Sequence, residues 1–157
     1  MRKLILICCA LVAFCFSGVL QAQNKAVKRL QPITYSSNVY DDLTSEELMF
    51  LSEIFKDKLK ENVLDRPNML LAYKNLLRNR IVIKQFNTLP TSEKYTNLNE
   101  IPLFTVYNSN LTRDVSYSSK TFNVLKYNLP FFGGNGGMFR INKTNYFLII
   151  KPQSYKK

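Results

Sequence analysis

The chain has 157 residues, of which 46% are hydrophobic and 21% charged, and its formal net charge at pH 7 is +11. These fractions are ordinary for a globular protein and argue against intrinsic disorder. The chain has no histidine, which excludes Ser-His-Asp triads, Cys-His pairs and histidine-based zinc sites from the chemistry that it can perform.

The first 22 residues have the three-part pattern of a secretory signal peptide. Arg2 and Lys3 precede an unbroken apolar run over residues 4–16, and Ala22 precedes Gln23 at the expected cleavage site. We therefore expect export to the periplasm or the extracellular medium, with cleavage near Ala22-Gln23 and no transmembrane segment afterwards. The apolar run is shorter than the span of about 20 residues that crosses a membrane. Retention as an N-terminal anchor, or lipidation, is the alternative.

All three cysteines lie within this signal peptide, so the mature chain would fold without disulfides. Their absence fits a bacterial exported protein better than a small extracellular eukaryotic domain. Removal of 22 residues leaves 135, which is enough for one domain with its own core. Residues 23–42 predict an extended arm, in which Ile33 and Tyr35 could pair at a sheet edge. Residues 43–157 predict a single α+β domain.

Two helices are predicted after the arm. Thr44 and Glu47 have the spacing of a capping box, which begins a helix over residues 44–62. Pro67 is tolerated in a first turn and begins a second helix over residues 67–79. The short link between them predicts antiparallel neighbours. Apolar side chains recur at helical spacing along the first helix: Leu48, Leu51, Phe55, Leu59 and Val63.

The pattern after residue 79 changes to that of strands. Segments that alternate in polarity or are rich in β-branched residues cover residues 80–86, 103–107, 121–129, 138–141 and 146–151. The last two flank Asn142 and Asn145, which are typical of a hairpin turn. We therefore predict an α+β fold, in which an N-terminal antiparallel helix pair packs on a four- to five-stranded antiparallel sheet.

The positive charge is concentrated in the second part of the chain. Residues 23–66 hold seven Lys/Arg and eight Asp/Glu, whereas residues 67–157 hold thirteen Lys/Arg and three Asp/Glu. A basic surface attracts polyanions, although scattered lysines that keep a domain soluble have the same composition. The weak binding candidates are the basic residues that interleave with aromatic ones, and two phenylalanines before the glycine cluster 133–137: Lys126, Arg140, Lys143, Phe131 and Phe132.

Carboxylates are the remaining acid–base groups. Glu53, Asp57 and Glu61 step by four residues, so they would project from one helix face rather than face each other as a glycan hydrolase requires. Asp41 and Asp42 lack the other ligands of a calcium loop. We expect no catalytic residue, no metal site and no cofactor. The sequence favours a non-catalytic exported module that binds an envelope protein or an anionic envelope component. A carboxylate-based hydrolase acting on envelope glycan, or a purely structural domain, is the alternative.

Overall fold

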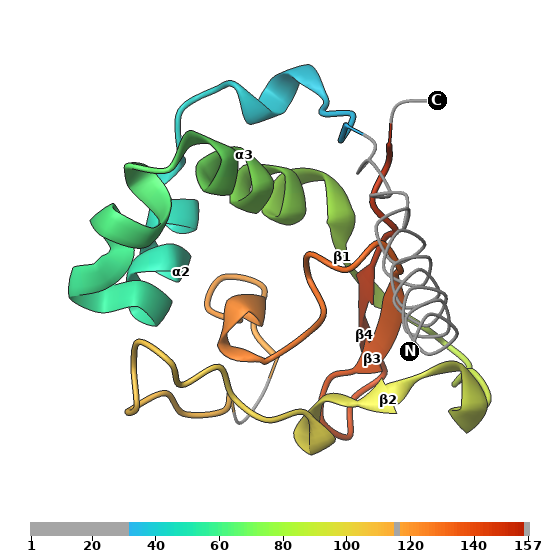
Figure 1. Ribbon diagram of the computed structural model, residues 1–157. Helices are drawn as coiled ribbons and strands as arrows, with labels where there is room; N and C mark the ends of the chain where they lie inside the picture. The colour runs from blue at the N-terminus through green and yellow to red at the C-terminus, as the bar shows by residue number, and fades with distance from the viewer. Residues whose placement is uncertain (1–31, 115–116, 156–157) are drawn as a thin grey trace, which may run out of the picture. The chain divides into compact units, whose positions relative to one another are not determined.

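The computed structural model describes residues 32–114 and 117–155 (Figure 1). The predicted signal peptide and residues 23–31 of the predicted arm lie outside the described residues. Within those ranges, no helix is both long and apolar enough to cross a membrane. The beginning of the described chain pairs with its end through an isolated β-bridge between Ile33 and Tyr155, which lies outside the four-stranded sheet. Tyr35, the other residue expected to pair at a sheet edge, forms neither a strand nor a bridge.

The predicted α+β class is confirmed, with a sheet of four strands in the order β1-β4-β3-β2. The strands are β1 (Ile81–Gln85), β2 (Thr96–Asn97), β3 (Gly137–Arg140) and β4 (Tyr146–Ile150). β4 pairs antiparallel with both β1 and β3, whereas β2 pairs parallel with β3. The prediction of a wholly antiparallel sheet is therefore wrong: the sheet is mixed.

The first helix, α2 (Ser45–Phe55), begins at the predicted capping box. The Thr44 side chain accepts a hydrogen bond from the Glu47 amide at 3.1 Å, and the Glu47 carboxylate accepts one from the Thr44 amide at 2.9 Å. The predicted continuous helix over residues 44–62 is wrong, because Lys56 has φ 50° and ψ −129° and ends α2. A 3-10 turn and a π-helical segment (Lys60–Leu64) follow.

The interruption at Lys56 leaves most of the predicted apolar stripe in the core. Leu51, Phe55, Leu59 and Val63 are all buried. The prediction fails only for Leu48, whose side chain is 42% exposed.

The second helix, α3 (Pro67–Asn75), begins at Pro67 as predicted and continues into a π-helical segment that ends at Arg80. Glu47 near the start of α2 forms an ion pair with Arg78 beyond the end of α3. Phe55 at the end of α2 contacts Tyr73 within α3. These contacts run in opposite order along the two helices, as the antiparallel arrangement requires.

Residues 121–129 are not the predicted strand. They contain a 3-10 turn (Val124–Lys126), and Phe122, Val124, Leu125 and Tyr127 are all buried, although strand alternation would separate them onto two faces. The buried Asn123 side chain explains the difference, because its Oδ1 accepts from the Leu125 amide at 3.0 Å. Such local bonds compete with the hydrogen bonding of a strand. Likewise, residues 103–107 form only an isolated bridge between Leu103 and Tyr127.

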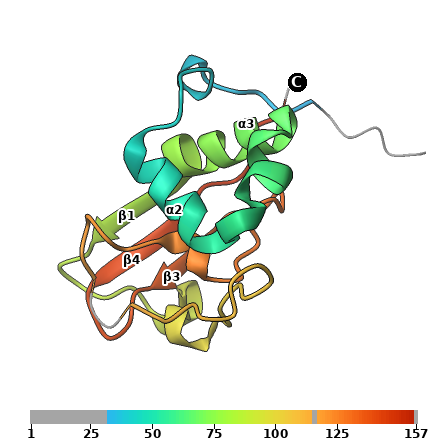
Figure 2. The same cartoon turned by 90° about the vertical axis from the view of Figure 1, so that its left-hand side faces the viewer.

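The described domain has three layers. Figures 1 and 2 show α2 and α3 on one side of the sheet, with residues 121–133 (orange) running between the helices and the strands. We call residues 121–133 the loop layer. Its buried apolar side chains belong to the same core as Leu51 of α2 and Leu148 of β4. A segment without regular structure therefore fills the centre of the domain, and the candidate site lies beside it.

Candidate functional site

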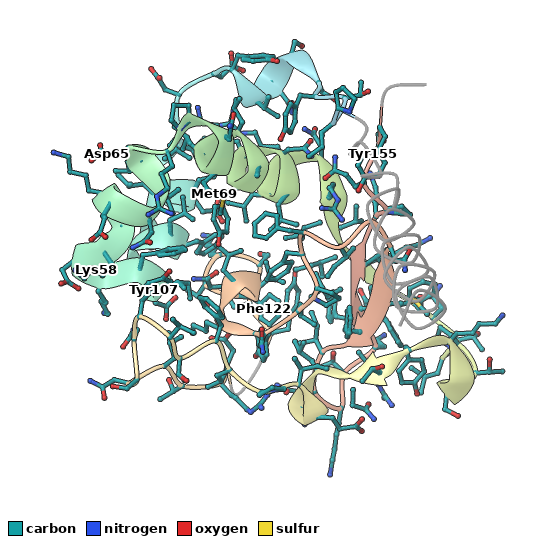
Figure 3. The ribbon with its side chains drawn as sticks, in the orientation of Figure 1. Lys58, Asp65, Met69, Tyr107, Phe122 and Tyr155 are labelled. Atoms are coloured by element: carbon teal, nitrogen blue, oxygen red, sulfur yellow. The ribbon has the colours of Figure 1, made fainter. Side chains whose placement is uncertain are left out.

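A cavity of about 330 Å³ lies between the helical segments and the loop layer. Figure 3 labels Met69 and Tyr107, which line it from α3 and from the loop after β2. Its walls come from five separate parts of the chain and are mostly apolar or aromatic. The lining residues are Ile54, Phe55, Asn62, Arg66, Met69, Tyr73, Phe104, Tyr107, Leu125, Tyr127, Asn128, Leu129, Phe131 and Phe132.

Exposure separates the floor of the cavity from its mouth. Ile54 is 1% exposed, Tyr127 2% and Leu125 3%, so these side chains form the floor. Phe132 is 51% exposed, and Arg66 is also exposed, so both lie at the mouth. The cavity is thus an apolar recess that opens to solvent beside one phenylalanine and one cation.

Aromatic rings that touch one another form the walls. The Phe55 ring meets the Tyr73 ring edge-on with centroids 5.6 Å apart, and its centroid lies 4.9 Å from that of Tyr107. Tyr73 also meets the Phe132 ring edge-on at 5.2 Å. Such pairs add about 0.5–1.5 kcal/mol each beyond simple burial. The walls are therefore shaped by the protein itself and do not need a ligand to order them.

Arg80 fixes the part of the loop layer that forms the mouth. Its side chain is buried, and its Nη1 donates to the Phe131 carbonyl at 2.5 Å, while Nη2 donates to the Gly133 carbonyl at 3.4 Å. Its Nε donates to the Lys151 carbonyl at 2.9 Å, which ties the loop to the chain after β4. Burial lowers the pKa of Arg80. These bonds hold the backbone on both sides of Phe132.

The glycine cluster that follows is largely exposed, but its backbone passes close to the end of β4 at Gly136. A Cβ atom at Gly136 would lie 2.4 Å from the Ile150 carbonyl oxygen, which is closer than real contacts permit. The Gln153 amide also donates to the Gly134 carbonyl at 3.2 Å. The glycines therefore let the chain pass closely over the end of β4, beside the segment that Arg80 holds.

Three polar groups around the cavity have no internal partner. Within the described ranges, no other residue forms a hydrogen bond or ion pair with the side chains of Arg66, Tyr73 or Asn128. Burial, together with the neighbouring Tyr107, raises the pKa of Tyr73 to about 12. The Tyr73 hydroxyl is therefore neutral at physiological pH and can donate a hydrogen bond. No described lining residue is an aspartate or a glutamate.

Two of the five sequence candidates come together at this cavity. Phe131 and Phe132 are adjacent in the lining, with Phe131 buried and Phe132 at the mouth. The Arg140 Nε instead donates to the Thr144 carbonyl at 2.7 Å and so stabilises the turn between β3 and β4. Lys143 is an exposed residue of that same turn.

Lys126, the remaining candidate, is not a surface cation. Its side chain is 8% exposed, and its Nζ lies 2.8 Å from an Asp114 oxygen and 3.1 Å from a Glu53 oxygen. Burial alone would lower the pKa of Lys126, but the hydrogen bonds and charges of the two carboxylates outweigh it and raise that pKa. The ammonium group is therefore occupied within the protein and is not offered to a polyanion.

Other basic side chains in residues 67–157 also bind oxygen atoms within the fold. The Lys74 Nζ donates to the Asp41 carbonyl at 2.6 Å, and Arg113 donates to the Leu98 carbonyl at 3.0 Å. With Arg78, Arg80 and Lys126, these residues bind carbonyl or carboxylate oxygens inside the fold. Much of the positive charge in residues 67–157 is therefore structural.

The acidic residues considered at the sequence level do not form a catalytic pair. Glu53 is paired with Lys126, whereas Glu61 pairs with Lys58 at 3.3 Å on the exposed surface. The interruption at Lys56 also removes Asp57 and Glu61 from the helix that carries Glu53. Across the described part of the chain, no group of three or more metal-ligating side chains is close enough to hold a metal ion.

Sequence reasoning missed most of the cavity. Phe55 lies on the predicted apolar stripe of the first helix and Tyr73 within the second predicted helix, but aromatic residues at such positions are typical of any core. Arg66, Tyr107 and Asn128 have no neighbours in the sequence that would distinguish them from ordinary surface or loop residues. Comparisons with family models, curated proteins and solved structures find no match to the chain.

Proposed function

We propose that the protein is a non-catalytic exported module that binds an apolar, ring-containing ligand in the aromatic cavity. One observation supports the proposal: a recess of about 330 Å³ has mostly apolar walls and three polar side chains that have no hydrogen-bond or ion-pair partner among the described residues. Small-molecule sites commonly have volumes of about 300–1,000 Å³ and combine apolar walls with a few polar groups. Export is the expectation from the signal-peptide pattern.

The composition of the site favours binding over hydrolysis. Hydrolysis by carboxylates needs two acidic groups on opposite sides of the substrate. The described lining has no acidic side chain. Glu53, which precedes the lining residue Ile54, forms an ion pair with Lys126 and accepts a hydrogen bond from the Asn123 side-chain nitrogen at 2.9 Å. The internal use of several cations also favours the cavity over a broad polyanion-binding surface.

A neutral fluorescent probe tests the proposal. N-phenyl-1-naphthylamine brightens in apolar sites, and we expect the purified protein to bind it saturably at one site per chain. Met69→Trp places a large ring in the cavity wall and should weaken binding at least about tenfold, because a filled recess cannot accept the probe. The measurement is a fluorescence titration with excitation beyond the tryptophan band.

Met49→Trp is the matched control, since Met49 is 51% exposed and does not line the cavity. This variant should bind the probe with unchanged affinity. Circular dichroism must show that both variants are folded. The proposal fails if the native protein binds no probe saturably, or if the two tryptophan variants bind it equally well.

A further inference from the structure

The cavity combines an aromatic interior with a single cationic side chain. Arg66 precedes α3, lines the recess and is exposed at its mouth. Several other arginines of the described chain bind carbonyls or carboxylates, as Arg78, Arg80 and Arg113 do. The Arg66 side chain has no such partner among the residues that the structure describes. A guanidinium group presents a planar set of donors that matches a carboxylate.

Two further donors line the same recess. The Tyr73 hydroxyl is neutral, and the Asn128 side chain carries an amide nitrogen. Neither side chain is bonded within the described part of the protein. The described lining has no acidic residue, and its one charged side chain is the Arg66 cation, which complements a negative group.

The walls restrict what can carry that negative group. Rings from Phe55, Tyr73 and Tyr107 surround the recess, and aromatic groups gain from edge-on or offset contacts with such rings. The volume of about 330 Å³ accommodates a small molecule of up to about three rings rather than a polymer segment. The packing of Phe132 against Tyr73 at the mouth also favours a small ligand over a bulky chain.

We infer that the ligand is a small aromatic carboxylic acid, whose ring occupies the recess and whose carboxylate is bound by Arg66. This inference rests on the proposed function and specifies its ligand class. Burial of the ring contributes to the binding affinity, and the charge-assisted hydrogen bonds to Arg66 give selectivity for the acid over a neutral analogue.

The test compares 3-phenylpropionate with 3-phenylpropionamide, which has the same ring and no charge. Both are titrated against the protein by isothermal calorimetry and by displacement of N-phenyl-1-naphthylamine. We expect the acid to bind at least about tenfold more tightly than the amide, as a charge-assisted bond at a partly exposed site predicts. Arg66→Gln should abolish this preference, and Arg66→Lys should restore part of it, because lysine retains the charge without the planar fork.

Lys60→Gln is the control, since Lys60 is exposed on the neighbouring π-helical segment and does not line the cavity. It should leave the preference for the acid unchanged. Equal affinity for acid and amide in the native protein would overturn the inference, and so would an unaltered preference in Arg66→Gln. With either result, saturable binding of N-phenyl-1-naphthylamine would still support the proposed binding of apolar ligands, and only the assignment to an aromatic acid would be lost.

The same ring and carboxylate also occur at the C-terminus of a polypeptide that ends in an aromatic residue. N-acetylphenylalanine represents this alternative ligand. We expect it to bind more weakly than 3-phenylpropionate, since its acetamido group adds bulk at the mouth. Tighter binding would overturn the assignment to a small free acid in favour of a polypeptide end.

Discussion

The Arg78 guanidinium joins three parts of the chain through one side chain. Its Nε and Nη2 each lie 2.6 Å from a carboxylate oxygen of Glu47, which forms a two-pronged ion pair. It also donates to the Asp42 carbonyl at 2.6 Å and to the Asn38 carbonyl. Arg78, in the π-helical segment after α3, therefore connects that segment to the start of α2 and to the residues before α2.

This ion pair predicts a pH-dependent stability. Burial alone would raise the pKa of Glu47, but hydrogen bonds from Arg78 and Thr44 and the charge of Arg78 outweigh it and lower that pKa below 4.5. The ionised group therefore stabilises the fold above about pH 4.5, and its contribution is lost as the pH falls through the lowered folded-state pKa. Glu47→Gln should reduce the free energy of unfolding at pH 7 by about 2 kcal/mol.

Urea titrations at pH 7 and at pH 3 measure this effect. The difference between the native protein and Glu47→Gln should shrink at the lower pH, because the Glu47 carboxylate of the unfolded chain is protonated there and the advantage of the ionised native group declines. Glu46→Gln is the control, because Glu46 lies in the same helical turn but is exposed. Equal losses for the two variants at pH 7 would contradict the role of the pair.

At the scale of elements, the end of α2 is strained at one residue. Lys56 adopts φ 50° and ψ −129°, a conformation that glycine tolerates and that costs other residues about 1–3 kcal/mol. Asn108 donates to the Glu53 carbonyl at 2.8 Å and so satisfies one of the last carbonyls of the helix. Tertiary contacts thus stabilise an interruption of the helix that the apolar pattern of the sequence does not predict.

Lys56→Gly should therefore stabilise the protein by about 1 kcal/mol, because the relief of backbone strain exceeds the added entropy of the unfolded chain. The Lys56 side chain is exposed, so its removal deletes no core packing. Thermal and urea unfolding measure the change. In Lys58→Gly, where φ is negative, the same substitution should destabilise the fold. Loss of stability in Lys56→Gly would show that the residue is not strained.

At the scale of the whole molecule, the loop layer makes helices and sheet parts of one core. Phe122 is 5% exposed, and its ring centroid lies 5.6 Å from that of Tyr117 and 6.0 Å from that of Tyr127. It belongs to the same buried cluster as Leu51 of α2 and Leu148 of β4. Because the layer contacts both sides, the helices should not unfold independently of the sheet.

Phe122→Ala should lower the free energy of unfolding by about 3–5 kcal/mol, and the smaller change Phe122→Leu by about 1 kcal/mol. Helical circular dichroism and tyrosine fluorescence should report the same shifted transition, because one core is weakened. Phe132→Ala, at the 51% exposed position, should cost less than Phe122→Ala. A tyrosine transition that shifts while the helical transition does not would contradict a shared core.

Local signals in the sequence determined where most of the regular elements lie. The capping box at Thr44 and Glu47, Pro67 in a first turn, and the apolar strands on either side of Asn142 all occur as predicted. The capping box acts between residues three apart in the chain, and the proline ring fixes its own φ angle, so both signals hold wherever the segment is placed. The two strands are joined by a short turn and pair with each other, so they too depend on residues that are close along the chain.

Tertiary structure decided the loop layer, the parallel strand β2 and the cavity. Residues 121–129 alternate like a strand, but they are buried between helices and sheet on both sides, where a side-chain amide replaces the ladder hydrogen bonds. β2 has only two residues and depends on its partner β3. Arg66 and Phe132, which are far apart in the sequence, both line the cavity. The polar side chains of Arg66, Tyr73 and Asn128 stand out because they have no hydrogen-bond partner in the part of the chain that the structure describes. Which polar groups remain unpaired depends on every long-range contact, so only the folded chain determines it.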